Sequence, residues 1–229
     1  MDRARRPAVP DLMRWLLPIA VATGLGGCAI FPRPLKAPPA DQTTVLLVSG
    51  GLGRPIEKIA RHPWFAVRRA GERAWRIWEV GGGGTLDDPF DNAPYLEPIL
   101  HAVWRGAEAD RAADCLEREA PPWLRALRYR AWPGPNSNTF GDDMLRRCGL
   151  RASQPATAIG KDYRGLVGAS WTSEGTGFQV ETAIFGLGLR VGLREGVEVH
   201  VLGLAIGVDL WPPALIVPLG SGRLGFADR

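Results

Sequence analysis

The sequence predicts an α+β fold that ends in a glycine-rich β-strand extension. Short β-branched and apolar runs stopped by glycine, such as residues 43–48, predict strands. A stretch rich in Ala, Glu, Asp and Arg at residues 107–120 predicts a solvated helix. From residue 165 onward, glycine, leucine and β-branched residues alternate in several short segments, which predicts a β-meander packed beside the first part.

The N-terminal segment, residues 1–27, has the pattern of an export signal. Basic residues precede an apolar run at 15–24 that is too short to span a bilayer comfortably. Leu25-Gly26-Gly27-Cys28 then resembles the lipobox of bacterial lipoproteins, which implies a lipid on Cys28. We therefore expect a lipid-anchored protein of the cell envelope that faces the periplasm; a retained signal anchor is the alternative. Ala29, where an aspartate would favour inner-membrane retention, favours the outer membrane.

Three segments follow the signal. Residues 28–40 contain four prolines and predict an extended tether. Residues 41–165 are expected to form the α+β core, and residues 166–229 the β-rich extension packed on it. Removal of residues 1–27 leaves about 202 residues, enough for one main domain.

Charge and motif content exclude several function classes. The chain carries +4, of which the four arginines and two aspartates of the signal account for +2. The remaining arginines are scattered, so we expect no nucleic-acid partner. The four glycines at 81–84 lack the Lys-Ser/Thr of a phosphate-binding loop, and His62, His101 and His200 lie far apart without zinc-site spacing. We expect no cofactor and no metal.

The α+β core is expected to begin with a strand at 43–48 and a helical turn at 55–61. Residues 62–80 predict an aromatic-rich hairpin; a two-residue loop at Ala70-Gly71 would set His62 opposite Glu79. A strand at 98–105, the helix at 107–120, a strand at 127–132 and a helix from about 138 to 148, closed by Gly149, follow. For Cys115 and Cys148 two alternatives are open: a disulfide, or two buried thiols on helices.

Two strings of residues carry a family resemblance. Trp132-Pro-Gly-Pro-Asn-Ser-Asn-Thr-Phe140 and Ala158-Ile-Gly-Lys-Asp-Tyr163, together with His62-Pro-Trp-Phe-Ala-Val67, resemble a bacterial family catalogued as domain of unknown function 3750. The resemblance covers roughly residues 55–225. It implies a family and no activity.

A second resemblance concerns mechanism. Asn136-Ser-Asn-Thr-Phe140 opening a helix resembles the Asn-Cys-x-x-Phe string of circularly permuted papain-like proteins, the lecithin:retinol acyltransferase and related amidase group. This implies a permuted papain-like core in which Ser137 is the nucleophile, His62 its base and Glu79 the residue that orients the base. Serine departs from that pattern, because a hydroxyl needs stronger activation than a thiol.

Each candidate residue also has a purely structural interpretation. Ser137 suits a helix N-cap, Thr139 with Asp142 suits a capping box, and Asn136 and Asn138, candidates for substrate binding, suit a turn. Lys161 and Asp162 are either substrate-binding charges or an ion pair within a turn. His62 can instead be a histidine at a strand end, and Glu79 a solvent-exposed strand residue. As a candidate base, His200 ranks below His62. His101 is expected to pack in the interior or to face solvent.

Two hypotheses about function follow. In the first, the protein is a hydrolase or acyltransferase that acts on an amide or ester of the envelope through Ser137, His62 and Glu79. In the second, it is a non-enzymatic envelope lipoprotein whose degenerate papain-like cleft binds a peptide, glycan, lipid or partner protein.

Overall fold

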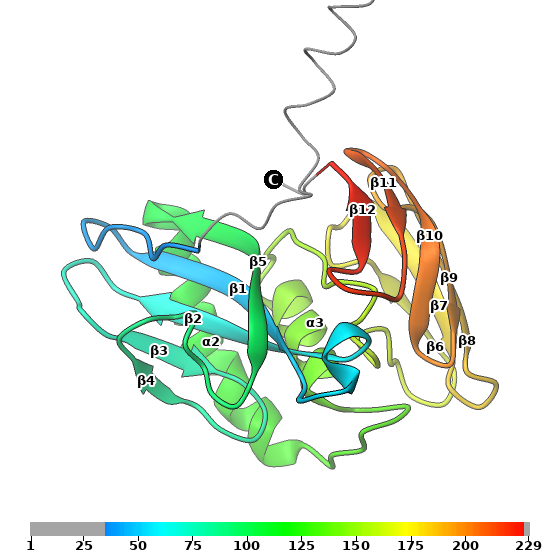
Figure 1. The fold of residues 1–229 in the computed structure, drawn as a ribbon, viewed down its shortest axis with the longest axis horizontal. Coiled ribbons are helices and arrows are strands. Elements are labelled where there is room, and N and C mark those ends of the chain that lie inside the picture. The colour runs from blue at the N-terminus through cyan, green and yellow to red at the C-terminus, as the bar shows by residue number, and fades with distance from the viewer. Residues whose placement is uncertain (1–34, 227–229) are drawn as a thin grey trace, which may run out of the picture.

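The computed structural model describes residues 35–226. These residues form a mixed α+β protein with two antiparallel sheets and two α-helices, as the sequence predicts (Figure 1). The predicted signal peptide, Cys28 and the first part of the tether lie outside the described residues. Within the described part of the chain, no helix has both the length and the apolar character needed to cross a membrane.

The first sheet has five strands in the order β4-β3-β2-β1-β5. Its strands are β1 (Thr44–Gly51), β2 (Arg61–Arg68), β3 (Trp75–Trp78), β4 (Gly84–Leu86) and β5 (Leu96–Arg105). A short 3₁₀ helix, η1 (Ile56–Lys58), lies between β1 and β2 where the sequence predicts a helical turn.

Side chains of β1 and β2 are buried on both faces of this sheet, which explains the almost continuous apolar run at 44–48. Val45 and Phe65 lie on the face that packs against α2 (Gly106–Ala126) and α3 (Ser137–Arg147). Leu46 and Trp64 lie on the opposite face, which we call the helix-free face. Phe90 and other residues of the β4–β5 connection cover it. The alternation of the strands thus separates two cores.

The hairpin of β2 and β3 differs from the prediction in its register. Phe65 pairs with Trp78 and Ala66 with Ile77, so paired positions sum to 143, whereas a two-residue loop gives 141. The connection runs over residues 69–74 and Gly71 adopts a φ of +79°. A shift of two residues keeps every side chain on its expected face.

The segment 127–132 forms no strand, which corrects the sequence prediction. The N–H of Arg130 donates to the carbonyl of Pro135, so the chain folds back on itself. Pro133 and Pro135 have no N–H for a ladder. The alternating apolar and charged residues of this segment belong to a loop whose arginines, Arg128 and Arg130, are exposed to solvent.

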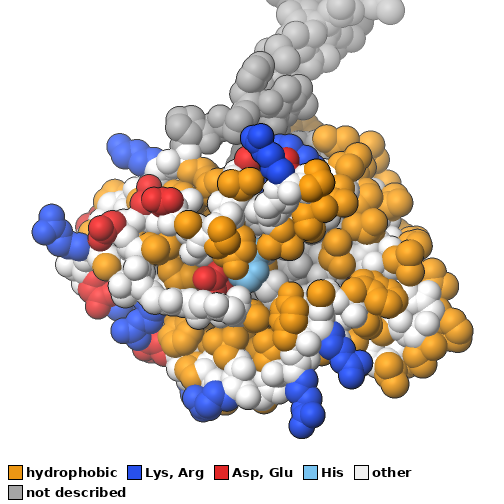
Figure 2. Space-filling view, turned by 60° about the horizontal axis from the view of Figure 1, so that its bottom comes forward, with side chains coloured by type: hydrophobic (Ala, Val, Ile, Leu, Met, Phe, Trp, Pro, Cys, Tyr) orange, Lys and Arg blue, Asp and Glu red, His pale blue; other side chains and the backbone are white. Residues whose placement is uncertain are grey.

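The second sheet is a seven-stranded meander in which each strand pairs with its neighbours in sequence, at one side of the molecule (Figure 1). Its strands are β6 (Gly168–Trp171), β7 (Gly177–Thr182), β8 (Leu187–Gly192), β9 (Gly196–Val201), β10 (Leu204–Leu210), β11 (Pro213–Ile216) and β12 (Arg223–Gly225). Hydrophobic side chains gather on the surface at that side (Figure 2). Backbone contacts such as Gly220 N to Lys58 O, at 2.7 Å, join this extension to the first part.

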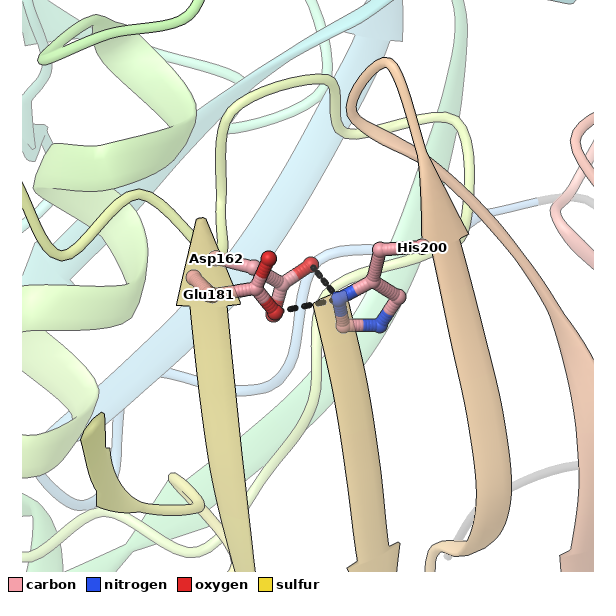
Figure 3. Close-up of side chains that lie close together, drawn as sticks. All are labelled: Asp162, Glu181 and His200. Atoms are coloured by element: carbon pink, nitrogen blue, oxygen red, sulfur yellow. Dashed lines mark hydrogen bonds and ion pairs between the residues drawn. The ribbon is translucent and has the colours of Figure 1, made fainter. Parts of the chain in front are cut away.

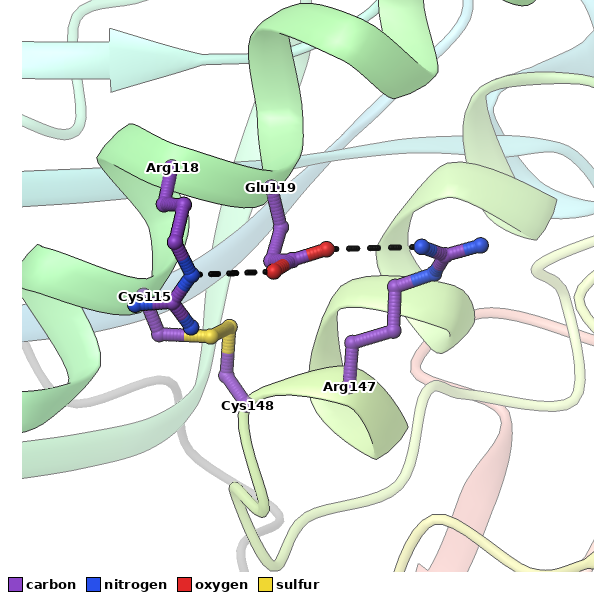
Figure 4. The surroundings of a disulfide bond; sticks show 5 residues. All are labelled: Cys115, Arg118, Glu119, Arg147 and Cys148. Carbon is purple, nitrogen blue, oxygen red and sulfur yellow. Dashed lines mark hydrogen bonds and ion pairs between the residues drawn. A yellow bond between two sulfur atoms is a disulfide. The ribbon is translucent and has the colours of Figure 1, made fainter.

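A disulfide between Cys115 and Cys148 joins α2 to the end of α3 (Figure 4). Of the two alternatives for these cysteines, the structure has the cross-link. Glu119 of α2 lies beside it and pairs with Arg118 at 3.0 Å and with Arg147 at 3.4 Å. Both helices are thereby fixed to each other at one end.

We expect the Cys115→Ser/Cys148→Ser double variant to have a free energy of unfolding about 2–4 kcal/mol lower, because the bond closes a loop of 33 residues in the unfolded chain. Urea denaturation followed by circular dichroism measures the change. Dithiothreitol should destabilise the natural chain and leave the double variant unchanged; equal sensitivity of the two proteins would contradict the cross-link.

Candidate functional site

His62, the predicted base, lies at the start of β2 in a buried polar cluster. Its Nε2–H donates to Oε2 of Glu79 at 3.0 Å, and Asn92 Nδ2 donates to the same oxygen at 3.0 Å. The imidazole stacks on Tyr95, with ring centroids 4.1 Å apart and an interplanar angle of 8°. The structure therefore joins His62 and Glu79, although through a different hairpin register from the predicted one.

Ser137, the predicted nucleophile, is not joined to this pair. His62 pairs with Gly50, and a side chain at Gly50 would meet Tyr95, so His62 lies on the helix-free face. Ser137 is the first residue of α3, which packs on the other face. Within residues 35–226, the Ser137 hydroxyl makes no hydrogen bond. The structure brings together the base and its orienting residue, but not the nucleophile.

Asn136, not Ser137, is the N-cap of α3. Its Oδ1 accepts hydrogen bonds from the N–H groups of Asn138 at 2.9 Å and Thr139 at 3.1 Å. The Asn136 N–H in turn donates to Thr139 Oγ1 at 3.1 Å, which completes a capping box. These bonds occupy two of the amides that an oxyanion at the helix start would use.

The two family strings are locked together by the side chains that begin α3. Asn136 Nδ2 and Asn138 Nδ2 both donate to the Ile159 carbonyl at 2.9 Å, and Thr139 Oγ1 donates to the Gly160 carbonyl at 2.7 Å. Gly160 has a φ of +84°, and a Cβ there would lie 2.4 Å from Asn136 Nδ2. The two asparagines, predicted to bind substrate, therefore position the Ile159-Gly160 turn.

This turn leads directly into a buried cluster of charges. Lys161 Nζ lies 2.9 Å from Asp162 Oδ2, so the ion pair expected within the turn is present. Arg190 of β8 donates to Asp162 Oδ1 at 2.5 Å and also pairs with Glu198 of β9 at 3.3 Å. Glu181 of β7 and His200 of β9 complete the cluster (Figure 3). Its members come from a loop and three strands of the second sheet.

Both ring nitrogens of His200 face carboxylates. Nδ1 contacts Glu181 and lies 3.5 Å from Asp162, and Nε2 lies 3.4 Å from Glu198. Burial alone lowers the pKa of His200, but Asp162 and the hydrogen bonds to Glu181 and Glu198 outweigh it and raise this pKa to about 9. Since both nitrogens then carry protons, His200 is an imidazolium at neutral pH.

The carboxyl groups of the cluster differ in the direction of their pKa shifts. Burial favours the neutral form of Asp162, but Lys161, His200 and Arg190 together hold its pKa well below the usual range. Burial raises the pKa of Glu181. Divergent pKa values of neighbouring carboxyls are common at functional sites and also in structural ion networks.

Asp162, Glu181 and His200 also have the composition of a metal site, with ligand atoms within 4.8 Å of one another. However, both oxygens of Asp162 already face cations, and Lys161, Arg190 and protonated His200 match Asp162, Glu181 and Glu198 in charge. A divalent ion would displace the His200 proton and leave excess positive charge. The residues present fit a balanced ion network better than a metal.

A pocket beside this cluster has a volume of about 30 Å³ and is lined in part by Trp132, Tyr163 and His200. That volume corresponds to about one water molecule. This pocket is therefore too small for a substrate.

A much larger groove, which we call the arginine groove, lies between the end of α2, residues 127–135 and the start of α3. Its volume is about 950 Å³. Four arginines and one acidic residue line it, together with several apolar side chains: Arg128, Arg130, Arg147, Arg164, Asp143, Pro122, Trp123, Leu127 and Leu166.

Two of these arginines have their charge matched, and two do not. Arg164 pairs with Asp142 at 2.5 Å and Arg147 with Glu119 at 3.4 Å. The exposed side chains of Arg128 and Arg130 have no hydrogen bond or ion pair with any residue of the described range, 35–226. Sequence reasoning missed this groove because its arginines are scattered along the chain and only the fold gathers them.

These features define an α+β protein in which two specific sequence strings lock a helix start to a buried ion cluster. A family model described as "Protein of unknown function (DUF3750)" matches residues 45–163, and the chain belongs to this family, as its strings predict. The match covers the first sheet, both helices and both strings, and ends before β6. Neither the curated proteins nor the solved structures contain a match.

We expect the buried cluster to make stability fall between pH 7 and 9. The pKa of His200 is about 9 in the folded chain against 6.5 for a free imidazole, so its stabilisation is complete below pH 6.5 and is lost as pH rises through 9. The loss amounts to roughly 3 kcal/mol. Urea denaturation at successive pH values measures it.

His200→Gln should abolish that slope. His101→Gln is the matched control, because burial lowers the pKa of His101 to about 3 and this residue does not titrate between pH 7 and 9. A slope that survives in His200→Gln would show that His200 is not the group responsible.

We expect Asn136→Ala to lower the free energy of unfolding by about 1–2 kcal/mol, because it removes the N-cap and also the bond to Ile159. Ser137→Ala, one residue further along, should change it by less than about 0.5 kcal/mol. Thermal denaturation of both variants makes the comparison, and equal destabilisation would contradict the assignment of the cap.

Proposed function

We propose that this protein is a lipid-anchored protein of the cell envelope whose domain binds an amphipathic anion in the arginine groove and does not transform it. The anchor is a diacylated Cys28, and the domain faces the periplasm, with the outer membrane as its membrane. The observation that carries the binding function is the pair of unmatched guanidinium groups, Arg128 and Arg130, beside an apolar wall.

The composition of the groove indicates the class of ligand. Arginine binds phosphate and carboxylate groups through paired N–H donors, so an anionic group fits beside Arg128 and Arg130. Trp123, Leu127 and Leu166 provide apolar surface in the same groove. A volume of about 950 Å³ lies in the range of small-molecule sites. A phospholipid with an anionic headgroup combines both kinds of group.

The hydrolase or acyltransferase hypothesis has one supporting observation, the hydrogen bond between His62 and Glu79. It lacks a nucleophile, because Ser137 and His62 belong to opposite faces of the first sheet. General-base catalysis needs the two groups within hydrogen-bond reach or one water apart. Binding without turnover is therefore the better-supported function.

We expect short-chain phosphatidylglycerol, below its micellar concentration, to bind the protein in isothermal titration calorimetry, and short-chain phosphatidylcholine to bind much more weakly. Arg128→Ala/Arg130→Ala should weaken phosphatidylglycerol binding about tenfold, which corresponds to about 1.4 kcal/mol. Arg105→Ala/Arg111→Ala is the matched control, because both arginines are exposed and lie outside the groove.

Equal binding by the two double variants would contradict the role of the groove. Mass spectrometry of the lipid after incubation tests the second part of the proposal. Recovery of intact lipid is expected, and hydrolysis that disappears in Ser137→Ala would instead establish the enzymatic hypothesis.

A further inference from the structure

The second sheet has its polar side chains on the buried face and its apolar side chains on the exposed face, which is the reverse of the usual arrangement. Gln179, Arg190 and Glu198 pair across β7, β8 and β9 on the buried face of the sheet. The opposite face, which we call the outer face, is exposed to solvent. In a soluble sheet with one covered face, apolar side chains normally point inward and polar ones outward.

The outer face carries continuous rows of apolar side chains. Registered pairing links one row across six strands: Phe178, Val191, Val197, Val208, Leu215 and Leu224. A second row contains Val180, Leu189, Val199 and Ile206. All of these side chains are exposed, to between 39 and 59 %. Contiguous apolar surface of this extent marks a contact with a partner or a membrane.

The outer face offers almost no polar group. Along β7 to β10, each outward-facing side chain is apolar except Thr182, whose hydroxyl donates to the Leu187 carbonyl at 2.8 Å. Protein–protein interfaces of standard size contain about ten hydrogen bonds. A face without charges or free hydrogen-bonding side chains instead matches hydrocarbon, which offers no such partner.

Three of the turns between β7 and β11 expose large apolar side chains as well, although the β8–β9 turn also carries Arg194. Phe185 is 70 % exposed, Leu193 81 % and Trp211 68 %. Turns of soluble sheets are usually built from small and polar residues. Trp211, together with Trp171 on the edge strand β6, has the amphipathic ring that is enriched at membrane–water interfaces.

Chain length also places the domain at a bilayer. If Cys28 carries lipid, six residues lie between it and Leu35, the first residue that the structure describes, so the two are seven Cα-to-Cα steps apart. Fully extended, these steps reach at most about 25 Å. A domain held so close to a membrane, with an uncharged apolar face, has the membrane itself as the nearest matching surface.

We propose that the outer face of the seven-stranded sheet lies on the lipid bilayer, with its side chains among the headgroups and the first acyl carbons. This inference rests on the proposed lipid anchor for the choice of occupant. The anchor and the outer face then act as two membrane contacts. Contact at two places orients the domain, whereas a single lipid leaves it free to rotate.

The test places a fluorescent probe at the centre of the outer face. Val199→Cys in the full-length lipoprotein is labelled with a small thiol-reactive fluorophore; the disulfide and the acylated Cys28 leave the new thiol to react. The protein is reconstituted in vesicles of phosphatidylethanolamine and phosphatidylglycerol, with and without doxyl-labelled phospholipid. Leu189→Cys, its neighbour in the same row, provides a second labelled position if Val199→Cys does not fold.

We expect the doxyl lipid to reduce the emission of the probe at position 199 about twofold and to leave the same probe at position 111 unchanged, since Arg111 is exposed on α2. Absence of quenching at 199 overturns the inference. Efficient cross-linking between copies through position 199 also overturns it, in favour of a second copy on this face.

Failure of the anchor proposal gives a different result. If Cys28 carries no lipid, mass spectrometry of the unlabelled protein shows the unmodified thiol. The proteins labelled at positions 199 and 111 then both lose the part of their vesicle binding that the lipid would provide. If only the outer face is misassigned, both variants stay attached and the probe at 199 remains unquenched. Ligand binding in the arginine groove is measured separately and is unaffected by either outcome.

Discussion

The ion pairs of Asp162 constrain the whole second half of the molecule. They bind the inward-facing charges of β8 and β9 to a loop that the start of α3 holds in place. Removing one partner from such a buried network leaves an uncompensated charge, which costs several kcal/mol. Because this network holds the polar face of the sheet in the interior, the opposite, apolar face is exposed. The internal electrostatics and the external surface are two consequences of one arrangement.

The family strings gain a physical meaning from the same arrangement. Asn136, Asn138 and Thr139 bond to the turn at Ile159-Gly160 and so deliver Lys161 and Asp162 to the cluster. These bonds use the amide nitrogens of both asparagines and the hydroxyl of Thr139. These residues of the strings thus make structural contacts. The four arginines of the groove that we propose as a ligand site lie outside the strings, whereas Pro135, Thr139 and Tyr163 of the strings also line it.

The elements that the sequence predicts well are those with a local cause. The apolar run of β1 and Gly149, with a φ of +64° at the end of α3, both act over a few neighbouring residues. The cap of α3 is also local, but it is Asn136 with Thr139 and not the predicted Ser137. The contact between His62 and Glu79 is predicted from a register that is wrong by two residues. The prediction holds because a shift of two residues leaves both side chains on the same face of the sheet. A permuted papain-like core remains a prediction.

The rest depends on distant residues, which no local pattern reveals. Asp162 and Arg190 are 28 residues apart, and Arg128 and Arg164 line the same groove only because the chain folds back. The alternation along β7 to β9 predicts strands but does not tell which face is buried. The usual assumption that apolar residues point inward fails here, because Lys161 and Asp162, which lie outside the sheet, pair with charged residues on its inner face.

The meander topology makes the second sheet modular. Each strand pairs only with its neighbours in sequence, and the cluster residues Glu181, Arg190 and Glu198 belong to β7, β8 and β9. The hairpin of β11 and β12 lies beyond them at the edge. A strand added beyond β12 would therefore enlarge the apolar outer face without altering the charge cluster, whereas β11 is itself tied to the interior through the buried Ile216.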